Sequence, residues 1–347
     1  MVNYPKRKLK SVGEKAEMNH TQKTFMPIWQ PFTGIRVETM IGALSDEEEK
    51  TVALAAHHYF QAKYDAAARE SQCFLNSPCP EIRATALLLH GMANVGLGNP
   101  ELVRADFAAL GKSAQQPENE MMAAVYDTLR FLLAVFFHTD GEIEFVSEER
   151  AALLPEGTRL YLLYAVAHEL YLQKRHQEAL GVTRSALIMA AGRFPSVSVY
   201  LNLVGSMVAV NLQDVELAEK FFNRAWQLAE AEDYIQPFVE HHGMLQGQIE
   251  RHIRIAQPQV YDQISEKVMA FSRGWMKIHN PDSVNKVTDR LSPYEFALAM
   301  MAARGKSNQE IADYLKISVN TVKFHLSSIY QKVEVSNRKE LEQYLNK

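Results

Sequence analysis

The sequence of 347 residues has little cysteine and no long apolar run. Its two cysteines, Cys73 and Cys79, form no CxxC pair, which argues against a disulfide scaffold and a structural zinc site. The most apolar windows, 131–138 and 186–192, are far shorter than the roughly 20 residues that a membrane-spanning helix needs. Because we also find no signal peptide, we expect a cytoplasmic protein that does not contact a membrane.

Neither sign of charge is in large excess. The chain has 37 Lys and Arg and 41 Asp and Glu, a net charge of −4, which excludes a uniformly basic nucleic-acid coat. Residues 284–347 nevertheless carry a net charge of +3, which leaves −7 for the rest. Any surface that binds nucleic acid is therefore expected near the C-terminal end.

Signals of catalysis are missing as well. There is no G-x-S-x-G motif, and the GKS strings at 111–113 and 305–307 lack the upstream glycine of a phosphate-binding loop. The pairs 57–58 and 241–242 are adjacent histidines, which point in different directions on a helix, so we expect them at the surface or in grooves. The sequence predicts no enzyme, no metal site and no cofactor.

Most of the chain is typical of an all-α fold. Residues 1–25 are basic with little apolar periodicity, which predicts a flexible arm. From 26 to 278, helix-forming residues are plentiful and no alternating β-branched run occurs. Prolines recur at intervals of 39, 38, 40 and 42 residues, a spacing suited to a helix pair, at Pro78, Pro117, Pro155, Pro195 and Pro237. Small residues keep nearly the same step or twice that step, at Ala55, Gly91, Ala167 and Gly205, which are 36, 76 and 38 residues apart.

Two segments of this region, 61–67 (QAKYDAA) and 173–179 (QKRHQEA), resemble the turn and second helix of tetratricopeptide repeats. The resemblance implies a solenoid of four or five degenerate helix pairs, since one pair cannot bury its own apolar face. Such a domain would sense a ligand, a peptide or a protein partner, and composition does not choose among them. We expect this sensor or interaction domain to span 26–278 and to be followed by a linker at 279–288.

Four helix-start signals follow the linker, at Ser292, Ser307, Ser318 and Asn337. Ser292 and Ser307 each have a Glu three residues later, the pattern of a capping box. A helix over 307–316 and a second over 319–333 would be joined by a tight turn, which is helix-turn-helix geometry. On the second helix, we expect Lys323 and Ser327 at DNA base edges and Phe324 against a thymine methyl group.

Residues 291–341, from LSPYEF to NRKEL, closely resemble the LuxR-type (GerE-type) DNA-binding domain of bacterial transcription regulators. Tyr294 departs from this family's pattern, which usually has Arg there. The resemblance implies a four-helix domain over 289–347. It also implies a set of residues that contact the DNA backbone: Ser307, Asn308, Asn320, Thr321, Lys332 and Arg338.

The last helix offers a dimerisation surface. Its apolar residues Leu341, Tyr344 and Leu345 share one face. The resemblance implies that two copies pair through this helix, forming a homodimer on an inverted-repeat operator in double-stranded DNA. The alternative is that all three residues pack inside their own domain, against Ile311 and Leu315.

Two functions are compatible with these features. The first is a sequence-specific transcription regulator whose helical-repeat domain senses an effector. The second is a repeat scaffold that binds a protein partner, with the small C-terminal domain as a protein-protein contact. The salt dependence of binding to duplex DNA distinguishes them, because each neutralised phosphate releases counterions.

Overall fold

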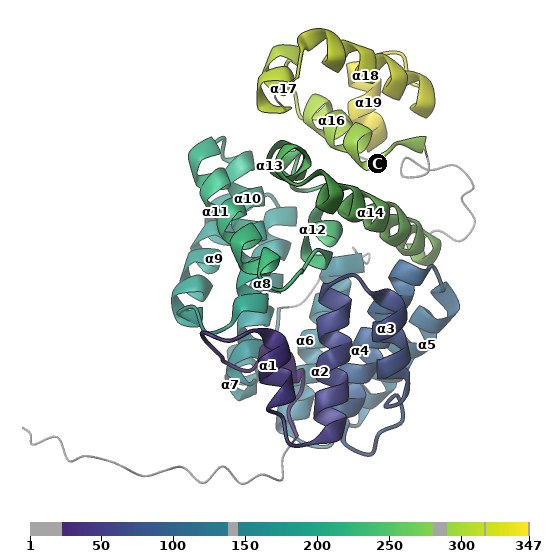
Figure 1. Cartoon of the computed structure of the whole chain (residues 1–347). Helices are drawn as coiled ribbons and strands as arrows, with labels where there is room; N and C mark the ends of the chain where they lie inside the picture. Colours follow the sequence, from purple (N-terminus) through teal and green to yellow (C-terminus); the bar gives the residue numbers. More distant parts are fainter. Residues whose placement is uncertain (1–22, 138–144, 280–289, 316, 346–347) are drawn as a thin grey trace, which may run out of the picture.

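The computed structural model describes residues 23–137, 145–279, 290–315 and 317–345. These residues form eighteen α-helices and no strands (Figure 1). None of the described helices has the length and apolar character needed to cross a bilayer. Most of the expected arm (1–22) and most of the expected linker (280–288) lie outside the described residues. The described residues form two main hydrophobic cores, one in a large body that ends at 279 and one in a small head that starts at 290, and the body also has a small satellite cluster around Val52 and Ile82.

Five helical hairpins make up most of the body. They are α2 (Glu47–Phe60) with α3 (Tyr64–Gln72), α4 (Pro80–Leu97) with α5 (Pro100–Gln115), α6 (Glu120–Phe137) with α7 (Glu148–Leu153), α8 (Glu156–Leu172) with α9 (His176–Ala190), and α10 (Pro195–Asn211) with α11 (Val215–Glu230). Before them come η1 (Pro27–Trp29) and α1 (Val37–Gly42), and after them α12 (Gln236–His241), α13 (Gln248–Ala256) and α14 (Pro258–His279). The all-α solenoid predicted from the sequence is confirmed.

The hairpin turns repeat the same backbone geometry. Four residues adopt positive φ at intervals of 36, 76 and 39 residues: Ala62, Gly98, Lys174 and Gln213. In each turn the next N–H donates to a carbonyl five residues earlier, as from Lys63 to His58 at 2.9 Å and from Asp214 to Ala209 at 3.0 Å. This is the bond that closes a helix C-terminus before a reversal. The sequence period therefore corresponds to one helix pair.

The small residues of the repeat let paired helices approach closely. A Cβ added to Gly91 of α4 would lie 2.5 Å from the ring of Phe107 in α5, and one added to Gly205 of α10 would lie 2.9 Å from Phe221 in α11. Ala55 and Ala167 occupy the equivalent places in α2 and α8 and are fully buried. The close approach inferred from the spacing is thus present at the two glycines, and the two alanines are buried at the equivalent places.

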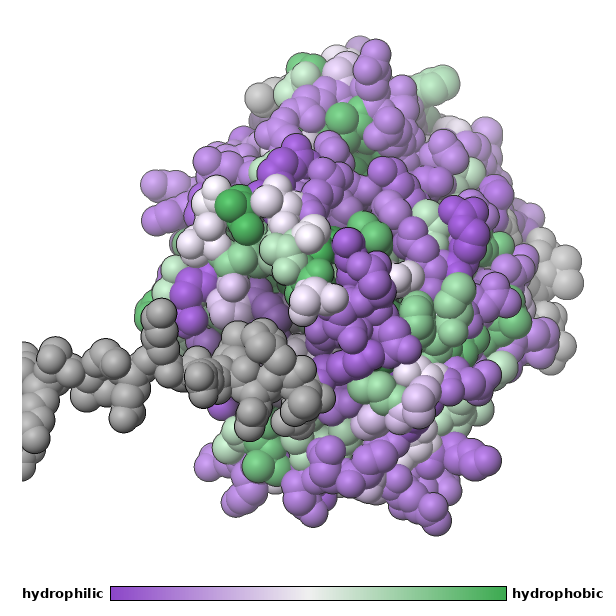
Figure 2. Space-filling model, turned by 60° about the horizontal axis from the view of Figure 1, so that its bottom comes forward, coloured by the Kyte–Doolittle hydropathy of each residue, from purple (hydrophilic) through white to green (hydrophobic). Residues whose placement is uncertain are grey.

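The C-terminal helices of the body close the hairpin array. α14 packs against α4, while α12 packs against α14, α10 and α2 (Figure 1). Gly274 permits the α14 contact, because an added Cβ would lie 1.7 Å from the carbonyl oxygen of Val95. The interior of the array is therefore filled by the body's own helices. The outer face in Figure 2 is mainly hydrophilic, with small separate apolar patches, as expected of a surface in water.

The N-terminal boundary of the body differs from the prediction. Phe25 and Met26 are each 1% exposed, and Lys23 forms an ion pair with Asp46 at 3.2 Å. The residues 23–25 that were assigned to the flexible arm thus belong to the packed body. Burial of one aromatic ring outweighs the basic composition of this segment.

Candidate nucleic-acid interface

The head is built from four short helices with well-formed caps. They are α16 (Pro293–Ala303), α17 (Asn308–Leu315), α18 (Val319–Val333) and α19 (Arg338–Leu345). Ser292 and Glu295 form the predicted reciprocal capping box, and Ser307 with Glu310 forms a second one. The Ser318 hydroxyl accepts from the Thr321 N–H at 3.0 Å. Each helix start predicted in this region is confirmed within two residues.

α17 and α18 form the helix-turn-helix unit. The inner face of α18 is buried in the head core through Val322, Leu326, Ile329 and Val333. Its outer face is exposed at Asn320, Lys323, Phe324, Ser327 and Gln331. Phe324 is 72% exposed, an unusual position for an aromatic ring that packing alone would bury. The outer face therefore presents donors, acceptors, one cation and one apolar group to solvent.

Lys332 is exposed on α18 but forms an ion pair with a buried residue of α16. Its ammonium group lies 2.7 Å from both carboxylate oxygens of Glu295, which is itself buried. Burial would raise the pKa of Glu295, but hydrogen bonds from Lys332 and Ser292 keep this pKa below its usual value. The pair links α16 to the C-terminal end of α18. Lys332 thus fixes the orientation of α18 as well as supplying charge near its end.

Arg338 also has partners within the head. Its guanidinium donates to the Lys306 carbonyl and to Asn308 Oδ1, the latter at 2.6 Å. It therefore brings α19 to the start of α17, where the Ser307 hydroxyl caps the helix. Three of the predicted backbone-contacting residues meet here, whereas Asn320 and Thr321 lie at the start of α18.

The prediction for the last helix is wrong in part. Leu341 is completely buried in the head core, and Tyr344 packs against the same core. The side chain of Leu345 lies outside the described ones. Leu341 cannot take part in a dimer surface, because its side chain is already packed inside its own domain. The alternative of packing within the domain holds for this residue.

The head rests on the body through α16 and α17. The guanidinium of Arg254 lies 4.9 Å from the centre of the Tyr294 ring, and that of Arg251 lies 4.7 Å from Tyr314. α16 lies between α18 and α14, so the outer face of α18 points away from the body (Figure 1). The family pattern usually has Arg at position 294. The contact between the Tyr294 ring and Arg254 of the body gives a physical reason for Tyr at this position.

Three of the four adjacent histidines are buried, although we expected all four at the surface or in grooves, and His58 is half-buried. His57, His241 and His242 are almost fully buried. His57 contacts the Tyr234 hydroxyl at 3.0 Å, and His242 contacts Glu250 at 2.8 Å. Their partners lie on other helices or across turns, so only the tertiary fold could have shown these contacts.

Comparisons with known proteins concern the C-terminal part of the chain. A family model described as "Bacterial regulatory proteins, luxR family" matches residues 289–345. YhjB of Escherichia coli (strain K12), named as a candidate HTH-type transcriptional regulator, is 41% identical over 66 residues, 19% of this chain and 33% of YhjB. The response regulator protein VraR of Staphylococcus aureus is 34% identical over 85 residues, 22% of this chain and 40% of VraR.

The chain thus spans between a third and two fifths of the length of these relatives. No solved structure matches it. The tetratricopeptide resemblance of the body remains a prediction, because the matched family model begins at residue 289. The match and the geometry of α16–α19 agree: residues 289–345 form a LuxR-type helix-turn-helix domain.

Proposed function

We propose that this protein is a sequence-specific DNA-binding transcription regulator that inserts α18 into the major groove. The observation that carries the proposal is the outer face of α18, which is exposed, carries mainly polar side chains and points away from the body. The names of the relatives that match this domain support the same role. A helix in the major groove needs such a face near its N-terminal end.

The exposed side chains fit base recognition. Lys323 can donate to the N7 and O6 acceptors of guanine, and Ser327 can donate or accept at a neighbouring base edge. Phe324 can contact a thymine methyl group. Ser307, Asn308, Asn320 and Thr321 are at or beside helix N-termini, where N–H groups favour phosphate oxygens. Lys332 and Arg338 support this arrangement through their partners within the head.

We further propose that two copies bind an inverted repeat. Paired recognition helices would lie one DNA turn apart, roughly 34 Å. The dimer surface belongs to the exposed side of α19 and not to Leu341, which is buried. The body would carry the signal that governs this binding, through an effector bound to the helical repeats.

Selection of tight-binding duplexes from a random pool with the full chain tests this function. Lys323→Ala should weaken binding to the selected site by about 1–3 kcal/mol, which is about 5-fold to 150-fold. Lys220→Ala, an exposed lysine on α11 of the body, is the matched control and should bind as the wild type does. Affinity should also fall steeply with rising salt.

Two results would contradict the proposal. If Lys323→Ala and Lys220→Ala bind the selected duplex equally well, α18 is not the reading helix. If the full chain binds no duplex at low salt, the scaffold with a protein-binding C-terminal domain becomes the better explanation.

A further inference from the structure

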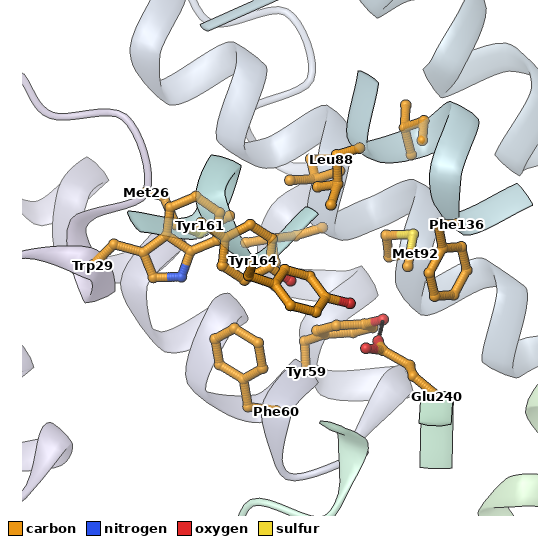
Figure 3. A pocket seen from close by; sticks show the side chains of 13 residues that line it. Met26, Trp29, Tyr59, Phe60, Leu88, Met92, Phe136, Tyr161, Tyr164 and Glu240 are labelled. Carbon is orange, nitrogen blue, oxygen red and sulfur yellow. Dashed lines mark hydrogen bonds between the residues drawn. The ribbon is translucent and has the colours of Figure 1, made fainter. Parts of the chain in front are cut away.

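The hollow beside Glu240 of α12, in the interior of the body, is too small for an organic ligand. Its volume is about 40 Å³, which holds about three water molecules at roughly 10–15 Å³ each, and Tyr59, Tyr161 and Tyr164 line it closely (Figure 3). A cleft between the body and the head is much larger, at about 710 Å³. This volume lies within the range of small-molecule sites, roughly 300–1,000 Å³.

Four segments of the chain form this junction cleft. The body contributes the turn between α8 and α9, the turn between α10 and α11, and the turn that precedes α13. The head contributes the loop between α16 and α17 together with residues of α17. Figure 1 shows these elements where the body meets the head. A ligand in the junction cleft would therefore touch both the helical hairpins and the helix-turn-helix unit.

The charged side chains of the junction cleft are mainly cations. Lys174 comes from the turn between α8 and α9, whereas Arg304 and Lys306 come from the head. Among the described residues, none of these three cations forms an ion pair. Arg304 donates only to the amide oxygen of Asn211, at 3.4 Å, and the Nζ atom of Lys306 lies 5.7 Å from the centre of the Tyr314 ring. The protein thus lines the cleft with three positive charges that it does not pair with acids.

The two carboxylates of the cleft compensate only part of this charge. Glu219 forms an ion pair with Arg251 of α13, so its charge is already balanced. Glu310 accepts from the Ser307 N–H at 2.7 Å as part of the capping box of α17. Three cations against this one carboxylate leave the cleft with a net charge of +2.

His176, the first residue of α9, indicates that cations from the two domains converge. Burial lowers the pKa of its imidazole, and the positive charges of Arg304 and Lys174 lower this pKa further. Arg304 belongs to the head and Lys174 to the body, and both act on the same ring. One ligand in the cleft is therefore within reach of both cations.

Two glutamines add hydrogen-bonding groups that the protein does not use. Gln246 is 2% exposed and Gln248 is completely buried. Within the described part of the chain, the Nε2 of Gln246 and the Oε1 of Gln248 have no hydrogen-bond partner. Gln246 also adopts a φ of 50°, a left-handed conformation that is costly for a residue other than glycine. Because buried polar atoms without partners are costly too, this part of the wall favours a polar ligand.

The charge and size of the junction cleft exclude other ligand classes. A metal cation would be repelled by the net positive charge. An apolar ligand would cover the cations and amides without pairing them. A DNA duplex is too wide to enter the cleft, and the outer face of α18 points away from the body.

We propose that the junction cleft binds a small soluble molecule with a phosphomonoester group, whose charge of about −1.5 to −2 matches that of the wall. Lys174, Arg304 and Lys306 hold the phosphate, while the glutamines favour a polar body for the rest of the ligand. That this ligand is the effector of DNA binding rests on the function proposed above. The turn that carries Gln246 also touches the head core, since a Cβ added to the next residue, Gly247, would lie 3.0 Å from the Met301 side chain.

Isothermal titration of the full chain with inorganic phosphate, at pH 8 and constant ionic strength, tests the site. We expect saturable binding of phosphate, displacement of the phosphate by glucose 6-phosphate, and about 10-fold weaker binding of acetate, which carries a single charge. No saturable binding of phosphate at millimolar concentrations, or equal binding of phosphate and acetate, would overturn the proposal. Failure of glucose 6-phosphate to displace phosphate would show a site for the free ion only and would overturn the phosphomonoester.

Variants on both sides of the cleft assign the binding. Lys174→Gln in the body and Arg304→Gln in the head each remove one charge from an exposed side chain, and each should weaken phosphate binding about 5-fold or more. Lys220→Gln, an exposed lysine of α11 outside the cleft, is the matched control and should bind phosphate as the wild type does. Unchanged affinity in both cleft variants would overturn the site. Loss in Arg304→Gln alone would place the anion on the surface of the head and overturn the junction cleft.

Two measurements separate this ligand from other sources of phosphate. In phosphate-free buffer, Lys174→Gln should bind the selected duplex as the wild type does, and weaker binding would show that Lys174 contacts DNA. Vesicles that contain phosphatidic acid should not sediment with the chain. Sedimentation that is lost in Lys174→Gln would assign the cleft to a lipid headgroup. Either result would overturn the soluble ligand.

Binding of the selected duplex with and without glucose 6-phosphate tests the effector role. A change in duplex affinity that is lost in Lys174→Gln supports this role. If glucose 6-phosphate binds and duplex affinity stays the same, the cleft site stands and the effector role fails. If the full chain binds no duplex under any condition, the proposed function fails while the phosphate titration still decides the cleft.

Discussion

The two cores of the molecule differ in how polar they are. The head core is built mainly from Leu, Ile, Val and Ala, and its polar groups sit in the helix caps at its surface. The body core buries hydroxyl, imidazole and carboxyl groups that pair across helices, as between Tyr64 and Gln236 at 2.6 Å. Local signals therefore specify the head, whereas contacts between residues more than 170 positions apart organise the body interior.

The largest expected effect tests whether the head core is independent. Leu341→Ala removes a fully buried side chain from a small aliphatic core, which should destabilise the head by about 2–5 kcal/mol. Hydrogen exchange followed by mass spectrometry should show loss of protection in α16–α19 and unchanged protection in α2–α11. Loss of protection throughout the chain would show that the two cores unfold as one.

The complementary change targets the body. Gly274→Ala would place a Cβ 1.7 Å from a backbone oxygen of α4, so α14 must shift. We expect a loss of about 2–3 kcal/mol in urea denaturation, confined to the body. Gly111→Ala is the control, because nothing lies within 4 Å of its added Cβ in α5, and it should raise stability by about 0.5–1 kcal/mol. A loss of stability in both variants would mean that crowding at α14 is not the cause.

A third prediction uses the buried acid that distinguishes the body interior. Burial raises the pKa of Glu240 to about 7, despite hydrogen bonds from Tyr59, Gln236 and Tyr200 that lower it. The folded state thus prefers the protonated acid, and its contribution to stability is present below about pH 4.5 and lost as the pH rises to 7. Burial has the opposite effect on the neighbouring His241 and lowers its pKa to about 4. The stability that the neutral imidazole contributes is therefore lost as the pH falls from 6.5 toward 4.

Glu240→Gln separates these two contributions, since the variant keeps His241. The stability of the variant relative to the wild type should increase by about 2 kcal/mol between pH 5 and pH 8. The tyrosine hydroxyls around Glu240 have pKa values raised well above 10 by burial, and so they do not titrate in this range. Urea denaturation at both pH values measures the change. A difference that stays constant with pH would show that Glu240 is ionised in the folded protein.

The head and the body also differ in how much of their structure the sequence predicts. Capping residues act within four positions, so Ser292, Ser307 and Ser318 mark helix starts that the structure confirms. The hairpin period is also visible in the sequence, since four of the five pairs repeat the same turn. Leu341 shows the limit of this reasoning: three apolar residues on a helix face do not reveal whether they contact their own domain or a partner.

The interior of the body could not be predicted for a related reason. Glu240 meets Tyr59 across 181 positions of sequence, and no periodic pattern connects them. We expected the adjacent histidines at the surface or in grooves, because a buried imidazole needs a hydrogen-bond partner and the sequence does not show one. His241 finds that partner in the Tyr164 hydroxyl, 3.0 Å away on α8.

The smallest expected effect concerns the boundary between the two cores. Arg254→Ala removes the cation from the face of Tyr294, which should weaken the docking of the head by about 0.5–1 kcal/mol. Protection of α16 against hydrogen exchange should fall about 2-fold to 5-fold, while the cores of both domains keep theirs. Arg184→Ala, an exposed arginine on α9, is the control and should leave α16 unchanged. Equal protection of α16 in both variants would show that the head is held without this contact. Because α16 lies between α14 and α18, a loosened contact at Tyr294 would also uncouple the recognition helix α18 from the body interior.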